Sequence, residues 1–342
     1  MQYLSDVRGF IHQRANRLLY CVLIPVLMSL TAPEAAQAQT RASTYPDTPL
    51  QLVIPFPAGG PADIVGRLYA QHLSTILGQP VVVENPAGAG GTIGTRAVAQ
   101  SAPDGRKLLF GTTSTMAINQ LIMKNLPYDF EKDFTVLGLI ANAPHVLAVR
   151  ADLPYKDVKE FIAAAKKEPG KYTFASAGVG TIIQMGSELF RSEAGIDLLH
   201  VPFKGGGPAT QAVLSGDVDM TVNDMTTLKS FLADGRLRPL AVAHTQRIAL
   251  LPNTPTFTEI GLSNVVSSTW WGLAVPSATP DDIQKVLKEA HNKIIQDPAY
   301  KARLEEMAVE TLVLSDAEIK SFMKNEVDKW ARIVKSANIT SN

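Results

Sequence analysis

Short apolar runs alternate with amphipathic stretches along most of the chain, and this alternation limits the folds open to it. Residues 50–56 (LQLVIPF) are followed by a Gly-Pro turn and by residues 62–77, where apolar side chains recur at helical spacing. The run 80–84 (PVVVE), a helical stretch at 92–100 and the run 107–112 continue the pattern. Strands that alternate with helices form parallel sheets covered on both faces. We therefore predict an α/β fold in which 80–84 is a buried strand.

The middle of the chain repeats this layout. Amphipathic or turn-bounded segments again alternate with short apolar runs of strand length. The expected helices are 157–167, 181–193 and 208–214, and the expected strands are 172–176, 198–203 and 218–222. Two α/β units therefore follow one another along the sequence.

Two pairs of strand-like runs lack an intervening helix, and they mark where the chain passes between the units. These pairs are 136–140 with 145–149, and 240–243 with 270–275. The last strand of one sheet followed by a strand of the other gives this pattern. We place the crossings near residues 141–144 and 259–268.

These crossings predict two lobes with a ligand cleft between them. The first lobe combines residues 39–143 with 266–342, and the second comprises 144–265. Each lobe is expected to hold a mostly parallel sheet flanked by helices. The helical C-terminal part, residues 280–338, is expected to pack back on the first lobe.

The N-terminal segment has the layout of a secretory signal peptide. Arg8, Arg14 and Arg17 precede the apolar run 18–30, and Ala36-Gln37-Ala38 supplies a small-x-small cleavage site. A retained membrane anchor is the alternative, but the run is shorter than the roughly 20 apolar residues of a span and contains Pro25. We therefore predict that residues 1–38 are removed and that the protein resides in the periplasm.

Cysteine content and charge narrow the function further. The only cysteine, Cys21, lies in the predicted signal peptide and follows Tyr20, whereas a lipoprotein signal needs a small residue there. The chain has 32 basic and 32 acidic residues. Such a balance gives no electrostatic reason to expect nucleic acid or a membrane surface as partner.

The loops after the predicted strands are rich in glycine and hydroxyl groups and poor in catalytic side chains. Ligands of open α/β sheets bind at this edge, where glycines allow close approach and helix N-termini attract anions. The candidate ligand-binding residues in these loops are Ala58, Gly59, Gly60, Asp63, Thr112, Thr113, Ser176, Ala177, Gly178, Thr181, Lys204, Asn223 and Asp224. We predict a site that holds an anion mainly through N–H and hydroxyl groups.

Several of these residues also have a structural interpretation. Asp63 suits the first turn of a helix, where it stabilises the helix dipole. Lys204 suits a solvated turn, and Trp270 and Trp271 suit packing over the region where the chain crosses between lobes. The six histidines include no pair at metal-ligand spacing, so we predict no metal site.

Enzyme motifs are absent from the sequence. The segment 88–94 (GAGGTIG) follows a strand, but its Gly-x-Gly-x-x-x-Gly spacing and the lack of an acidic residue after 107–110 argue against a dinucleotide. There is no Gly-x-Ser-x-Gly elbow, Gly-Lys-Ser/Thr loop or His-Glu-x-x-His pair. We predict no catalytic residue and no cofactor.

The chain resembles the Bug receptors, the substrate-binding components of tripartite tricarboxylate transporters. The resemblance covers essentially the whole chain after the predicted signal peptide. The strings that carry it are 45–46 and 52–63 (LVIPFPAGGPAD), 82–85 with 88–91, 102–105, 126–129, 175–178, 200–205 and 251–256. It implies a type II periplasmic binding protein fold whose lobes close over a carboxylate. It also implies that the protein is a monomer and delivers the carboxylate to a membrane transporter.

Carried over to this chain, the resemblance implies Phe56, Gly59, Gly60 and Asp63 from the first lobe and Ser176, Gly178 and Thr181 from the second as ligand contacts. Family members tend to carry Phe-Asp-Asn where this chain has Val222-Asn223-Asp224. The ligand stays open among dicarboxylates, tricarboxylates, aromatic acids and amino acids. We expect 112–116, 182–185 and 223–226 to form the end of the cleft that discriminates. The alternatives are a receptor that presents its ligand to a sensor kinase, and an exported oxidoreductase or hydrolase.

Overall fold

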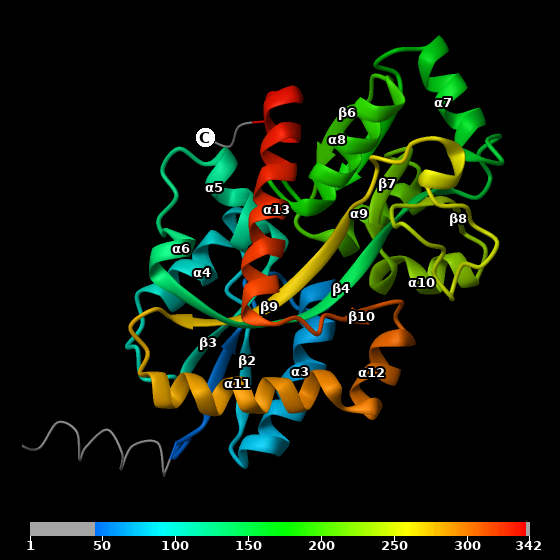
Figure 1. The fold of residues 1–342 in the computed structure, drawn as a ribbon. Coiled ribbons are helices and arrows are strands. Elements are labelled where there is room, and N and C mark those ends of the chain that lie inside the picture. The colour runs from blue at the N-terminus through cyan, green and yellow to red at the C-terminus, as the bar shows by residue number, and fades with distance from the viewer. Residues whose placement is uncertain (1–44, 340–342) are drawn as a thin grey trace, which may run out of the picture. The chain divides into compact units, whose positions relative to one another are not determined.

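The predicted alternation of strands and helices is present in both halves of the described chain (Figure 1). The structure is a computed structural model that describes residues 45–339, so the predicted signal peptide lies outside the described residues. The N-terminal half contains β1 (Leu50–Val53), α3 (Pro61–Leu77), β2 (Val81–Glu84), η1 (Ala89–Gly91), α4 (Thr92–Ala99), β3 (Lys107–Thr112), η2 (Ser114–Ile118), α5 (Asn119–Ile122), α6 (Phe130–Asp133) and β4 (Phe134–Arg150).

The remaining elements follow the same order as the predicted ones. They are α7 (Val158–Lys167), β5 (Thr173–Ser176), α8 (Ile182–Ala194), β6 (Leu199–Pro202), α9 (Gly206–Ser215), β7 (Met220–Asp224), α10 (Met225–Ala233), β8 (Leu237–Val242), η3 (Thr258–Ile260), β9 (Ser268–Pro276), α11 (Asp281–Gln296), α12 (Pro298–Glu305), β10 (Glu310–Thr311) and α13 (Asp316–Ser336). No helix among residues 45–339 has the length and apolar character needed to cross a membrane.

The strands form two sheets that share β4. In the first sheet the order is β2-β1-β3-β9-β4, and β10 also pairs with β4. In the second sheet β4 lies between β8 and β7, followed by β5 and β6. The strands that alternate with helices pair in parallel, namely β1 with β2 and β3, and β5 with β6 and β7. Strands β4 and β9 are antiparallel to their neighbours.

The first predicted crossing is a continuous strand rather than a joint between two strands. Residues 134–144 of β4 pair with β9, and residues 145–150 pair with β7 and β8. Pro144 stands where the partner strands change. A proline favours an extended conformation in the residue before it, so it does not interrupt the strand. The expectation of two separate strands on either side of 141–144 was therefore wrong.

Strand β2 is not buried as predicted. It lies at the end of the first sheet and pairs only with β1, and Val82 is 51% exposed. A run of valines fits a central strand and an edge strand equally well, because both are extended. The position of a strand in the sheet is decided by tertiary contacts that the local sequence does not report.

The C-terminal helix α13 contacts both halves. Ile319 and Phe322 pack into the core beneath the first sheet, whereas Trp330 and Ile333 pack into the core that includes α8. Figure 1 shows α13 running from the region of β10 toward α8. The prediction that residues 280–338 pack on the first lobe was therefore incomplete.

Candidate ligand-binding site

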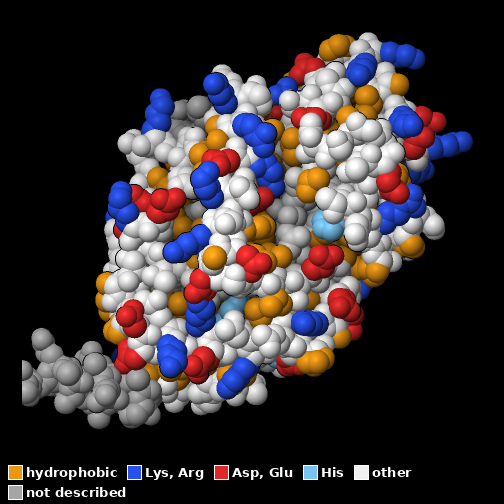
Figure 2. Space-filling view, in the orientation of Figure 1, with side chains coloured by type: hydrophobic (Ala, Val, Ile, Leu, Met, Phe, Trp, Pro, Cys, Tyr) orange, Lys and Arg blue, Asp and Glu red, His pale blue; other side chains and the backbone are white. Residues whose placement is uncertain are grey.

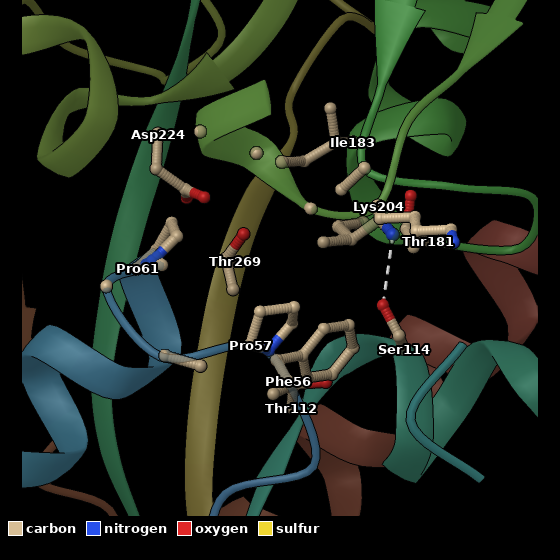
Figure 3. Close-up of a pocket in the computed structure, with 18 of the residues that line it drawn as sticks. Phe56, Pro57, Pro61, Thr112, Ser114, Thr181, Ile183, Lys204, Asp224 and Thr269 are labelled. Carbon is tan, nitrogen blue, oxygen red and sulfur yellow. Dashed lines mark hydrogen bonds between the residues drawn. The ribbon is translucent and has the colours of Figure 1, made fainter. Parts of the chain in front are cut away.

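A cavity of about 220 Å³ lies where the first turns of α3, α8 and α9 meet the end of β7 (Figure 3). Both sheets contribute, because the loop after β1 and the end of β3 face the loops after β5, β6 and β7. The lining residues are Phe56, Pro57, Ala58, Gly59, Gly60, Pro61, Ala62, Thr112, Ser114, Ala177, Thr181, Ile182, Ile183, Lys204, Gly205, Gly206, Gly207, Pro208, Asp224, Thr269 and Trp271.

Four helices begin at this cavity without a side-chain cap. The N-cap residues are Gly60 for α3, Thr181 for α8, Gly205 for α9 and Asp224 for α10. The two glycines have no side chain to accept a hydrogen bond, and the side chains of Thr181 and Asp224 accept none from their helices. The first N–H groups of a helix have no intrahelical partner and carry partial positive charge. The uncapped N-termini of α3, α8 and α9 that converge on one cavity form a site suited to an anion such as a carboxylate, whereas α10 presents the carboxylate of Asp224.

The two halves meet directly beside this cavity. The N–H of Ile182, at the start of α8, donates a hydrogen bond to Oγ of Ser114 on η2 at 3.1 Å (Figure 3). The side chain of Ile122 also approaches Gly180 so closely that a Cβ at Gly180 would lie 2.1 Å from its Cδ1. The structure therefore has the halves in contact around the cavity.

Asp63 supports the loop after β1 and does not line the cavity. Its Oδ2 accepts hydrogen bonds from Gly59 N and from Arg67 Nε, both at 2.9 Å, and Arg67 in turn donates to Asn85. Burial alone would raise the pKa of Asp63, but the hydrogen bonds from Arg67, Gly59 and Asn85 outweigh it and lower the pKa. Asp63 thus has the early-helix role that was the alternative to ligand contact.

Ser176 also lies behind the cavity wall. Its hydroxyl is 2.6 Å from Nε2 of His200 and accepts a hydrogen bond from Gly178 N at 3.2 Å. Gln184 approaches Nδ1 of the same histidine and accepts from Gly180 N at 2.8 Å. Burial lowers the pKa of His200 to about 4, so its ring is neutral at physiological pH. This network fixes the loop 177–181 that faces the cavity.

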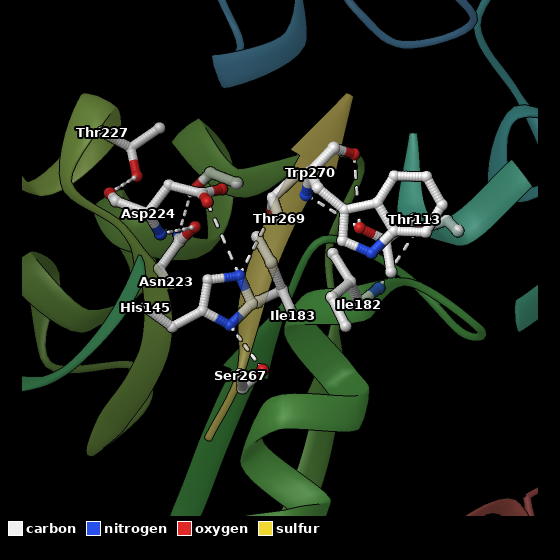
Figure 4. A network of polar contacts seen from close by, with 12 residues as sticks. Thr113, His145, Ile182, Ile183, Asn223, Asp224, Thr227, Ser267, Thr269 and Trp270 are labelled. Atoms are coloured by element: carbon white, nitrogen blue, oxygen red, sulfur yellow. Dashed lines mark hydrogen bonds and ion pairs between the residues drawn. The ribbon is translucent and has the colours of Figure 1, made fainter. Parts of the chain in front are cut away.

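Thr113 and Asn223 are occupied by the backbone and by neighbouring side chains (Figure 4). The hydroxyl of Thr113 accepts from Trp270 N at 2.9 Å and joins β3 to β9. The amide of Asn223 donates to Gly206 O and to Thr210 Oγ1, both at 3.1 Å, and joins β7 to α9. Neither residue lines the cavity.

The structure therefore divides the predicted site residues into two groups. Those that line the cavity are Phe56, Ala58, Gly59, Gly60, Thr112, Ala177, Thr181, Lys204 and Asp224. Asp63, Thr113, Ser176 and Asn223 lie behind it, and Gly178 lines a second, adjoining cavity of about 930 Å³. The second cavity is also lined by residues 87–92 and shares Phe56, Thr181 and Lys204 with the first.

Strand β9 contributes two lining residues that the sequence analysis did not include. Thr269 and Trp271 both line the cavity, although Trp271 was expected only to pack. Trp270, one position away, points to the other face, where its indole N–H donates to Glu326 at 2.9 Å. Side chains alternate between the faces of a strand, so only one of two adjacent tryptophans can face the site.

The cavity contains one acidic and one basic side chain among its lining residues. Lys204 is exposed, lines both cavities and has no carboxylate within 4.0 Å among the described residues. Asp224 is 1% exposed, and burial raises its pKa to about 7 against the opposing effect of Thr269. No group of three or more His, Cys, Asp or Glu residues between positions 45 and 339 is placed to hold a metal ion.

Comparison with known proteins identifies the family. The family model described as "Tripartite tricarboxylate transporter family receptor" matches residues 65–339. The chain belongs to this family. It is 33% identical over 322 residues to a UPF0065 protein in the tcbD-tcbE intergenic region of Pseudomonas sp. strain P51, covering 94% of this chain and 95% of that protein. Protein BugT of Bordetella pertussis is 32% identical over 314 residues, covering 92% and 96% of the two chains.

Solved structures show the same fold. "Structure of a periplasmic transporter" has a TM-score of 0.81 and 36% identity, covering 86% of this chain and 99% of that one. R. palustris Rpa4515 with adipate has a TM-score of 0.83 and 29% identity, covering 86% and 99%. MatC from Rhodopseudomonas palustris with bound malate has a TM-score of 0.79 and 30% identity, covering 85% and 100%. The fold is the predicted two-lobed periplasmic binding protein fold. As a member of a family of solute-binding receptors, the protein is a receptor and not an enzyme.

Proposed function

We propose that this protein binds a small carboxylate in the 220 Å³ cavity and delivers it to a membrane transporter of the tripartite tricarboxylate type. The observation that carries the proposal is the convergence of uncapped helix N-termini on that cavity. Lys204 at its edge adds a free positive charge. The adipate and malate in two structures of related proteins support a carboxylate as the ligand class.

The proposal includes the division into lobes and the cellular location. We propose a first lobe of residues 39–143 and 266–342 and a second lobe of 144–265, so that the first boundary falls inside β4. Residues 1–38 would direct the protein to the periplasm as a cleaved signal peptide, and the receptor would act as a monomer. Figure 2 shows acidic and basic side chains intermixed over the visible face, without a broad area of one sign.

Because this face offers no broad charged area as a docking signal, we propose that the transporter recognises the closed form of the lobes, which the ligand stabilises.

A negative charge placed at the start of α8 tests where the carboxylate binds. Thr181 is the N-cap of α8 and lines the cavity. In Thr181→Asp the new carboxylate would cap the helix and occupy the anion site, so affinity should fall at least about tenfold while the helix is preserved or stabilised. Thr181→Asn is the matched control, because its amide also caps the helix but adds no charge.

Titration calorimetry of the mature chain with succinate, glutarate, malate, adipate, benzoate, aspartate and glutamate gives the readout. We expect at least one of these acids to bind the wild type and to lose much more affinity in Thr181→Asp than in Thr181→Asn. Equal affinities of the two variants would place the carboxylate elsewhere. Absence of binding by every acid would reject the proposed function.

A further inference from the structure

Asp224 places a buried carboxylate on the wall of the cavity. It is the last residue of β7 and the N-cap of α10, it is 1% exposed, and its carboxylate points into the cavity (Figure 3). A buried carboxylate is costly unless it is paired. The hydrogen-bond and ion-pair partners of this carboxylate therefore indicate the function of the residue.

The usual structural reason for aspartate at this position does not apply. An N-cap aspartate normally accepts a hydrogen bond from the second or third N–H of its own helix. Asp157 does so for α7, accepting from Glu160 N at 2.9 Å, and Asp129 does so for α6, accepting from Lys132 N at 3.3 Å. Asp224 makes no such bond with α10. Its side chain is turned away from the helix that it precedes.

The surrounding protein does not neutralise Asp224. Its Oδ1 accepts no hydrogen bond from the described residues, and none of their lysines or arginines lies within 4.0 Å. The nearest ring nitrogen is Nε2 of His145 at 3.5 Å (Figure 4). That histidine is held by Thr269 Oγ1 at 3.0 Å and Ser267 Oγ at 2.9 Å, and burial lowers its pKa to about 3. His145 is therefore neutral and cannot serve as a counter-ion.

The neighbouring residue shows that the fold does not need the charge. Asn223 supplies the hydrogen bonds that join β7 to α9, and its Oδ1 also accepts from Asp224 N at 2.9 Å. The backbone here is thus held by a neutral amide. The carboxylate of Asp224 is therefore not needed to hold the backbone, and it faces the cavity beside Thr269 and the neutral His145.

We propose that Asp224 receives an ammonium group of the ligand, so that this receptor selects aminocarboxylates. The inference rests on the proposed function, in which the ligand's carboxylate lies at the helix N-termini. An unpaired buried anion across the same cavity then calls for a cation on the ligand, because only a positive charge compensates it. When Asp224 is ionised, a second carboxylate would be repelled, and a hydroxyl would donate a hydrogen bond but leave the charge uncompensated.

The titration of Asp224 gives this inference a distinct signature. The charged or titratable groups on the elements around it are neutral His145 on β4, Lys204 before α9, the Asp63–Arg67 pair on α3 and Lys229 on α10, which donates to Glu306 O. Because burial raises the pKa of Asp224 to about 7, its charge changes near neutral pH. Affinity for an ammonium-bearing acid should therefore rise between about pH 6 and pH 8, whereas affinity for a nitrogen-free acid should fall.

Matched pairs of acids test the inference by calorimetry. The pairs are aspartate with succinate, glutamate with glutarate, and 4-aminobutyrate with butyrate, each measured at about pH 6 and pH 8 on the mature chain. In at least one pair the amino acid should bind about tenfold or more tightly than its partner at the higher pH. Malate and 2-hydroxyglutarate test whether a neutral donor suffices.

Two variants assign the effect to Asp224. Asp224→Asn should bring the preference for the amino acid down to about unity and remove the dependence on pH, while binding of the nitrogen-free acid persists or improves. Glu188→Gln is the matched control, because burial also raises the pKa of Glu188 but its side chain is not part of the cavity wall. It should behave as the wild type.

Equal or tighter binding of the nitrogen-free or hydroxy acids by the wild type would overturn the inference and leave the proposed function intact. Absence of binding by all of these acids would overturn both.

Discussion

At the scale of single residues, the unpaired carboxylate of Asp224 should also lower the stability of the free protein. Its folded pKa of about 7 lies above the ordinary value of 3.8, so the folded state loses stability as pH rises from about 4 to above 7. The loss should total about 4 kcal/mol. Asp224→Asn removes the charge at nearly constant size. We therefore expect its Tm to match the wild type near pH 4 and to exceed it by several degrees above about pH 7.

Thermal unfolding of both proteins in parallel, without ligand, measures this difference. His145 lies 3.5 Å from Asp224, but burial lowers its pKa to about 3, so it stays neutral in the pH range compared. The other buried histidines have the same surroundings in both proteins. A Tm difference that is independent of pH would mean that Asp224 is already compensated in the folded protein.

The sequence located the site loops but not the orientation of their side chains. Glycines and hydroxyl groups after each predicted strand identified Gly59, Gly60 and Thr181, which line the cavity. Ser176 was indistinguishable from them in sequence, and Asp63 had both a ligand-binding and an early-helix interpretation. They turn away because their partners, Arg67 and His200, are positioned by tertiary structure. The choice between Asn223 and Asp224 likewise depends on which face of β7 meets the cavity.

At the scale of elements, the helices and strands that alternate were predictable, and the elements shared by both halves were not. The β-α periodicity gave α3, α8 and β5 within a few residues. It could not show that β4 is one strand or that α13 spans both cores, because continuity depends on partners far away in sequence. Such elements connect the halves, so their stability depends on contacts with both halves.

A single carboxylate in α13 makes this dependence testable. Glu326 is buried, and its Oε2 accepts from the indole N–H groups of Trp270 at 2.9 Å and Trp330 at 3.0 Å. Glu326→Leu would leave both donors buried without an acceptor, so the free energy of unfolding should fall by about 2–5 kcal/mol. Glu326→Gln keeps one acceptor oxygen and should lose less.

Denaturant unfolding gives these values. The exposed Lys324→Ala on the same helix serves as control and should change stability by no more than about 0.5 kcal/mol. A leucine variant as stable as the control would show that the two indoles find other acceptors and that α13 does not depend on this contact.

At the scale of the whole described chain, the sequence predicted two α/β halves but not how closely they meet. The contacts beside the cavity are both polar and apolar: Ile182 N donates to Ser114 Oγ, and Ile122 packs against Gly180. The covalent and packed connections are β4, the segment before β9, and α13. Elements that run continuously from one half into the other are the arrangement expected of a hinge.

Energy transfer between two dyes tests whether ligand closes this hinge. The only cysteine of the sequence, Cys21, lies in the predicted signal peptide, so Ala97→Cys on α4 and Lys166→Cys on α7 can be labelled selectively in the mature chain. Both positions are exposed, one on each half. Because a ligand that contacts both halves favours the state in which they meet, a saturating acid should narrow the distance distribution and raise transfer efficiency. The same acid should raise the Tm, by binding only the folded state. A raised Tm with unchanged transfer efficiency would mean that the acid binds to a cleft that is already closed, and that lobe closure is not the signal by which the proposed transporter would recognise the loaded receptor.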